Sequence, residues 1–154
     1  MLVLVGVDRL RSGFTLPQTI NALNLRLGRR AVLHLSHVED NELLALYNAA
    51  TAFITLTEYE GFGLPVIEAM ACGTPVIAAR ASTIPEVVGE AGCLVSDPAD
   101  AAEVSRAILA VSSDFDRRSH MIQRGFEQAS TFSWRRCADE TIGVLEQCGR
   151  MPPL

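Results

Sequence analysis

Two glutamates flank a glycine-rich loop near the middle of the 154-residue sequence. In the stretch EYEGFGLPVIEAMACGTPVIAA, residues 58–79, Glu60 and Glu68 stand on either side of the segment GFGLP. The two glycines allow a sharp turn and let a ligand approach the backbone closely. The proline suits the first position of a helix, where its missing N–H group costs nothing. The pattern therefore predicts a loop followed at once by a short helix, with one carboxylate before the helix and one within it.

The start of such a helix is suited to binding an anion. We expect free amides of Leu64, Val66 and Ile67 at a helix end that carries roughly half a positive charge. For Glu68, expected in the first turn, stabilisation of about 0.3–1 kcal/mol by the helix dipole is the simpler explanation. For Glu60 the simpler explanation is a solvated surface position. A carboxylate also accepts two hydrogen bonds from a vicinal diol, so the pair could hold one sugar at each end of a diphosphate.

Composition narrows the classes of function. A net charge of −5 argues against general nucleic-acid binding, but it leaves room for one small anionic ligand held by backbone amides. The four cysteines show neither C-x-x-C pairing nor metal-like spacing with the three histidines. This predicts reduced, mostly buried thiols in a cytosolic protein, and no metal site. No apolar run approaches the ~20 residues of a membrane-spanning helix, so we expect a soluble chain without a transmembrane segment.

Short apolar runs alternate with segments of helical period along the chain. Continuous apolarity is typical of strands that are covered on both faces, so the runs predict a parallel sheet. The predicted strands are Leu2–Val7, Ala31–Ser36, Ala52–Thr57, Pro75–Ala79 and Gly92–Ser96. The predicted helices are Leu16–Leu27, Asp40–Ala50, Pro65–Cys72, Ile84–Val88, a helix that starts at Asp97-Pro98, Phe115–Ala129, and a last helix with Ser133 as its N-cap.

This alternation predicts one α/β domain over residues 1–150, built on a single Rossmann-like, doubly wound parallel sheet. Ligands of such sheets lie beyond the carboxyl ends of the strands. Glu60 and its loop follow the predicted strand Ala52–Thr57, so they fall at that end.

The string EGFGLPVIEAMACGTPVIAA, followed by STIPEVVGEAGCLVSDPAD, resembles the donor-binding half of the retaining glycosyltransferases of family four. These enzymes have the GT-B fold, and their motif is two glutamates separated by seven residues, like Glu60 and Glu68. The resemblance covers roughly residues 30–148 and, weakly, 2–29. It implies that the domain is one half of a GT-B fold and binds a nucleoside-diphosphate sugar without a metal or other cofactor.

The resemblance also implies roles for individual residues. Glu60 would bind hydroxyls of the donor sugar and is the residue assigned to catalysis, while Glu68 would bind the ribose diol. Backbone amides of the loop would face the sugar and the diphosphate, and the segment after the second strand would lie near the base. The implied donor-binding residues are Glu60, Gly61, Phe62, Gly63, Leu64 and Glu68, with His37 and Val38 near the base.

The implied reaction is transfer of a hexosyl group from a GDP- or UDP-sugar with retention. STIPEVVGEAG resembles mannosyltransferases and related bacterial members most, so a hexose such as mannose or glucose is expected. In this family the departing diphosphate is thought to take the acceptor's proton. The N-terminal acceptor domain is expected to be absent, together with the basic residues that contact the diphosphate. Arg9 and Arg11 are the alternative source of that charge. We therefore expect little turnover by this polypeptide alone.

Three further expectations concern partners, location and an alternative function. A separate chain that carries the N-terminal domain is one expected partner. The last helix is expected to expose part of an apolar face and therefore to associate with itself or with a partner. The location is expected to be cytoplasmic, with peripheral membrane association only through the missing domain. The alternative function is a non-catalytic nucleotide-sugar binding or interaction module, whereas an unrelated flavodoxin-like regulator would predict neither the glutamate pair nor the GFGLP loop.

Overall fold

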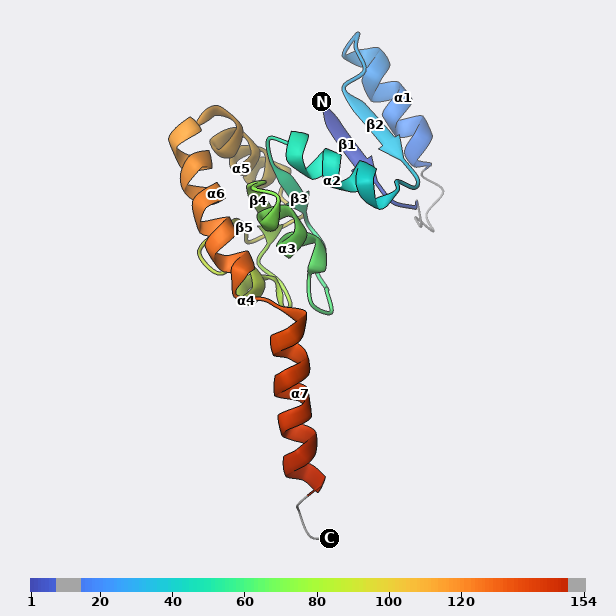
Figure 1. Ribbon diagram of the computed structural model, residues 1–154. Helices are drawn as coiled ribbons and strands as arrows, with labels where there is room; N and C mark the ends of the chain where they lie inside the picture. Colours follow the sequence, from blue (N-terminus) through green and yellow to red (C-terminus); the bar gives the residue numbers. More distant parts are fainter. Residues whose placement is uncertain (8–14, 150–154) are drawn as a thin grey trace. The chain divides into compact units, whose positions relative to one another are not determined.

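The computed structural model describes residues 1–7 and 15–149 and divides into two compact units, Met1–Ala45 and Leu46–Leu154 (Figure 1). Its paired strands are all parallel and alternate with helices, which confirms the predicted α/β class. The hydrogen bonds, however, join the strands into two groups, where one continuous sheet was predicted. Apolar runs predict where strands form, but they do not specify which strands become neighbours.

In the first unit, strand β1 (Leu2–Val5) pairs in parallel with β2 (Val32–Leu35). Helix α1 (Leu16–Arg26) packs on β2. The Asn24 side chain of α1 joins the two elements at the start of β2: its oxygen accepts from two consecutive amides at 2.8 and 2.9 Å, and its nitrogen donates to the Val32 carbonyl at 2.9 Å. A single amide side chain therefore fixes how α1 meets the strand.

The second unit is built on a three-stranded parallel sheet in the order β3-β4-β5. Helix α2 crosses the boundary between the two units, and the remaining helices alternate with the strands before three of them close the chain. The bounds are α2 (Asp40–Ala49), β3 (Phe53–Thr55), α3 (Leu64–Ala71), β4 (Val76–Ala79), α4 (Ile84–Val88), β5 (Cys93–Val95), α5 (Ala101–Ser113), α6 (Phe115–Ser130) and α7 (Trp134–Gly149).

The core of this second unit surrounds β4, whose four residues are all buried. Ile77 of β4 clusters with Val95, with two residues of α5 and with Met121 of α6. Helix α6 also packs along α3 (Figure 1). Gly125 of α6 allows close approach to Met70 of α3. Because complete burial of such side chains contributes about 1.5–3 kcal/mol each, this core fixes α3 in place.

Capping residues decide where two of the closing helices begin. Helix α5 starts at Ala101, with Asp100 accepting from the Ala102 amide at 2.8 Å, so the predicted start at Asp97-Pro98 is wrong. The Asp97 carboxylate instead accepts from the Ala99 amide and closes a turn before the helix. For α7 the predicted cap is confirmed, because Ser133 Oγ accepts from the Arg136 amide at 3.0 Å.

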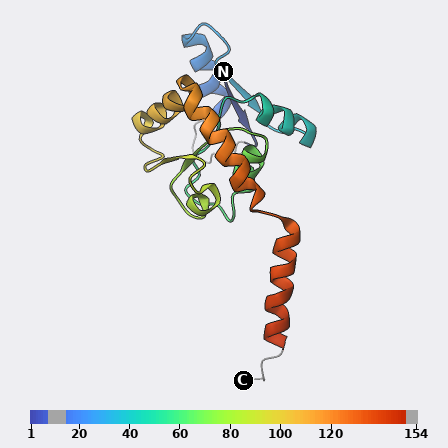
Figure 2. The same ribbon diagram turned by 60° about the vertical axis from the view of Figure 1, so that its left-hand side comes forward.

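Helix α7 follows α6 (Figure 2). Over its described residues it contains no buried side chain. Two of the four cysteines, Cys137 and Cys148, lie on this helix and are exposed, while Cys72 and Cys93 are half-buried. The prediction of mostly buried thiols is therefore wrong, because half of them lie on a helix that packs against little. Within residues 1–7 and 15–149, no helix combines the length and the apolar character needed to cross a membrane.

Candidate functional site

The loop between β3 and α3 depends on one glycine. Gly63 is the N-cap of α3 and has φ of +95°, in the left-handed region that favours glycine. A Cβ at this position would lie 3.0 Å from Ile84 Cδ1. Gly61 differs, because a Cβ there would meet nothing within 4 Å. The turn into α3 therefore requires glycine at the second position of the GFG segment and tolerates a side chain at the first.

Two hydroxyl groups hold this loop from the start of α4. Ser82 Oγ donates to the Glu60 carbonyl at 2.8 Å. Thr83 Oγ1 lies 3.2 Å from the same carbonyl and 3.3 Å from that of Phe62. Thr83 is the N-cap of α4, but its side chain makes no capping bond, because its hydroxyl is directed to the loop. Ser82, with φ of +51°, has the only positive φ among the described residues other than glycine.

The N-terminus of α3 differs in two respects from the prediction. The Val66 amide donates to the Gly63 carbonyl at 3.0 Å, so it is not free. Since α3 begins at Leu64, Glu68 lies beyond the first turn, which contains no acidic residue. Stabilisation of a carboxylate by the helix dipole falls off beyond the first turn. The dipole therefore stabilises Glu68 less than the sequence predicted.

Neither glutamate of the pair is buried: Glu68 is exposed and Glu60 is half-buried. Glu68 Oε2 accepts a hydrogen bond from Tyr47 Oη at 3.2 Å. Burial first, and then the charge of Glu68, raises the pKa of the Tyr47 phenol far above its ordinary value, so the phenol stays protonated and donates. Glu68 is therefore held on one side by a neutral donor, while the carboxylate remains accessible to solvent.

The residues predicted near the base lie in the other unit. His37 follows β2, with Nε2 at 3.2 Å from Glu39 Oε1, and both side chains are 79% exposed. Val38 is half-buried. The second unit thus contains the predicted residues from Glu60 to Leu64 together with Glu68, whereas His37 and Val38 belong to the first. Arg9 and Arg11 lie outside the described residues.

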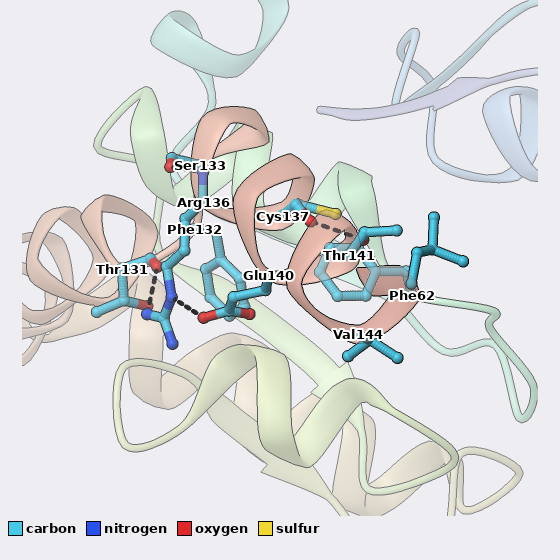
Figure 3. Close-up of a pocket in the computed structure, with 10 residues that line it drawn as sticks. Phe62, Thr131, Phe132, Ser133, Arg136, Cys137, Glu140, Thr141 and Val144 are labelled. Carbon is cyan, nitrogen blue, oxygen red and sulfur yellow. Dashed lines mark hydrogen bonds and ion pairs between the residues drawn. The ribbon is translucent and has the colours of Figure 1, made fainter. Parts of the chain in front are cut away.

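A groove of about 680 Å³ adjoins the loop on the side of α7 (Figure 3). The Phe62 ring meets Phe132 edge to face, with 5.8 Å between ring centroids. Arg136 and Glu140 of α7 form an ion pair at 2.7 Å within this groove. The groove is lined by Phe62, Thr131, Phe132, Ser133, Arg136, Cys137, Glu140, Thr141, Val144 and Leu145.

Three residues of the candidate site were missed at the level of the sequence. Tyr47, Ser82 and Thr83 reach the loop or Glu68 from 21 to 23 positions away along the chain. The pair Ser82-Thr83 before Ile-Pro is typical of the start of a helix. That pattern predicts that a hydroxyl caps the helix, and it does not predict hydrogen bonds to the carbonyls of a distant loop. Nothing in the sequence indicated a partner for Tyr47.

Comparison with protein families places this loop in context. The model for "Glycosyl transferases group 1" matches residues 1–128, which include every predicted site residue. The chain belongs to the group 1 glycosyl transferases. The predicted family is therefore confirmed, and the Rossmann-like fold is that of one half of a GT-B protein.

Two of the relatives that this chain resembles are mannosyltransferases by name. The chain is 45% identical over 115 residues to the O-antigen chain mannosyltransferase B of Escherichia coli, covering 75% of this chain. It is 39% identical over 126 residues to the MMP alpha-(1->4)-mannosyltransferase of Mycolicibacterium hassiacum, covering 79% of this chain. The chain spans 30% of the length of each of these relatives.

Among solved structures, HepE of Anabaena in complex with UDP-glucose is similar, with a TM-score of 0.77 and 25% sequence identity. The match covers 94% of this chain and 40% of that one. The match to the family model and the match to this structure thus each extend over most of the chain.

Proposed function

We propose that this chain is the nucleotide-sugar donor domain of a retaining hexosyltransferase. The observation that carries the proposal is a glycine-dependent turn into α3, flanked by the half-buried Glu60 and the exposed Glu68. The N-terminus of a helix favours an anion, and a carboxylate accepts hydrogen bonds from a vicinal diol. A nucleoside-diphosphate sugar offers both groups in one molecule, with a sugar at each end of the diphosphate.

In this proposal each part of the donor has its own residues. Glu60 binds hydroxyls of the transferred sugar, and Glu68 binds the diol of the ribose. The amides of Phe62, Gly63 and Leu64 face the diphosphate, where negative charge develops as the glycosidic bond breaks. His37 and Val38, after β2, lie near the base. The site requires no metal ion, so donor binding should be the same in EDTA and in magnesium.

The sugar that we propose is a hexose, with mannose as the first candidate. The two relatives described above are mannosyltransferases by name, and HepE was solved with UDP-glucose. GDP-mannose and UDP-glucose are therefore the donors to compare first. Because the chain spans 30% of its relatives' length, we propose donor binding as its own function and glycosyl transfer as the activity to which it contributes.

Calorimetry with matched glutamine variants tests this assignment. Glu60→Gln should weaken binding of the nucleotide sugar but not of the free nucleoside diphosphate, because Glu60 contacts only the transferred sugar. Glu68→Gln should weaken both by about 10- to 100-fold, since a hydrogen bond to a charged group contributes ~1.5–3 kcal/mol. Glu58→Gln, in the same loop and exposed, is the control and should change neither.

The opposite pattern would refute the proposal. If the unmodified chain binds neither a nucleoside diphosphate nor its sugar conjugates at millimolar concentration, the domain is not a donor domain. If Glu60→Gln and Glu68→Gln bind both ligands as well as the unmodified chain does, the donor lies elsewhere.

A further inference from the structure

The phenol of the buried residue Tyr47 donates a hydrogen bond to the carboxylate of the exposed residue Glu68. Tyr47 is 7% exposed and belongs to the last turn of α2, whereas Glu68 belongs to α3. The 3.2 Å hydrogen bond between Tyr47 Oη and Glu68 Oε2 links the two helices across 21 positions of sequence. One oxygen of Glu68 is thereby engaged inside the protein, while the residue as a whole stays open to solvent.

Tyr47 itself is held at two further points. Its ring meets Phe53 of β3 edge to face, with 5.5 Å between centroids and 76° between planes. Its carbonyl accepts a hydrogen bond from Thr74 Oγ1 at 2.6 Å, and Thr74 is buried. A tyrosine packed and bonded in this way cannot move its hydroxyl far, because interiors are close-packed and a buried polar group needs its partner.

Toward the carboxylate of Glu68 the phenol is the donor. Burial and the neighbouring carboxylate raise the pKa of Tyr47, so the phenol keeps the proton that it donates. A glutamate alone on a helix surface rotates about three bonds and must be immobilised when a ligand binds. A fixed donor on one oxygen removes part of that freedom in advance and leaves the remaining lone pairs for two hydroxyl groups.

We propose that Tyr47 is a positioning residue, which pre-orients Glu68 for a vicinal diol and makes the site select ribonucleotides over their 2′-deoxy and 3′-deoxy analogues. The inference rests on the donor-binding function proposed above. Tyr47 does not contact the ligand in this scheme; it acts through Glu68. Its removal should therefore matter only for a ligand that offers both hydroxyl groups to that carboxylate.

Calorimetry with GDP and UDP and with their 2′-deoxy and 3′-deoxy analogues tests the inference. The unmodified chain should bind the ribonucleotides more tightly than either analogue. Tyr47→Phe keeps the ring against Phe53 and should weaken ribonucleotide binding by about 3- to 10-fold, the effect of immobilising one side chain. Binding of the analogues should change little, so the preference for ribose should contract. Tyr59→Phe, at the other tyrosine, which is 80% exposed, is the matched control and should change neither affinity.

A double-mutant cycle separates positioning from a general structural effect. In the Glu68→Gln background, adding Tyr47→Phe should produce no further loss, because the carboxylate that it orients is already gone. If Tyr47→Phe weakens ribonucleotides and deoxy analogues equally, or weakens binding to the same extent in the Glu68→Gln background, the positioning role is wrong. Unchanged ribonucleotide affinity in Tyr47→Phe would also overturn it. If the unmodified chain binds no nucleotide at all, the donor-binding function itself fails.

Discussion

Individual residues in the loop before α3 have separable roles, although they are adjacent in sequence. Glu60 contributes its carbonyl to the hydroxyls of Ser82 and Thr83, which leaves its carboxylate available for a ligand. The two neighbouring glycines also differ, since only Gly63 has a positive φ and a close neighbour at its missing Cβ. Backbone groups thus fix the loop, and the carboxylates are left for chemistry.

The contrast between the two glycines gives a prediction on stability. Gly63→Ala should lower the free energy of unfolding by about 1–3 kcal/mol, because alanine at this φ is strained. Its Cβ would in addition press on Ile84 Cδ1 at 3.0 Å. Gly61→Ala is the control and should stay within about 0.5 kcal/mol of the unmodified chain. Urea unfolding of the three proteins measures the difference, and equal loss in both variants would contradict the role given to Gly63.

At the scale of the elements, polar side chains link the ends of strands to the helices that follow. Glu103, in the first turn of α5, accepts from the amides of Ser96 and Asp97 at 2.7 and 3.0 Å, just after β5. These two bonds lower the pKa of the Glu103 carboxyl below its ordinary value. The connection between β5 and α5 is therefore held by an ionised group.

This connection should make part of the stability depend on pH. Since the folded pKa of Glu103 is depressed, its contribution is complete above the unfolded value of about 4.3 and is lost as pH falls through the lower folded value. Glu103→Gln should accordingly be less stable than the unmodified chain at pH 7, and the gap should narrow as the pH falls below about 4.3. Thermal unfolding between pH 7 and pH 3 measures this gap. Glu58→Gln serves as the control for the loss of one carboxylate, and a gap for Glu103→Gln that widens in acid would refute the argument.

Element ends show how far the sequence could predict the fold. Ile84–Val88 was predicted with the bounds that the structure has, because proline and the flanking residues mark both ends. The start of α5 was misplaced, because Asp97 and Asp100 are both good caps and only the tertiary fold chooses between them. The bonds from Tyr47 and Thr83 could not be predicted at all, because they join residues that no local pattern relates.

For the molecule as a whole, the proposed donor residues are divided unequally between the two units. The second unit contains most of the buried apolar residues, centred on β4 and α3, and it positions Glu60 and Glu68. In the described part of the first unit, only Ala31 and Val32 are buried apolar residues. A two-stranded sheet by itself is only marginally stable. The core of the second unit therefore determines the geometry of the glutamate pair.

The last helix leads to a prediction about association. On α7 the side chains of Trp134, Ile142, Val144 and Leu145 are between 54% and 79% exposed. Large apolar groups that gather on one helix are typical of an interaction surface. We therefore expect the chain to self-associate as its concentration rises.

Sedimentation equilibrium of two charge-matched variants tests this expectation. Leu145→Lys places a charge on the helix face that also bears Trp134, because the two positions are eleven residues, or about three turns, apart. It should shift the equilibrium towards monomer. Gln147→Lys adds the same charge on the opposite side of α7 and should leave the equilibrium almost unchanged. If the unmodified chain stays monomeric at high concentration, or if both variants shift the equilibrium equally, the apolar face of α7 does not mediate association between copies.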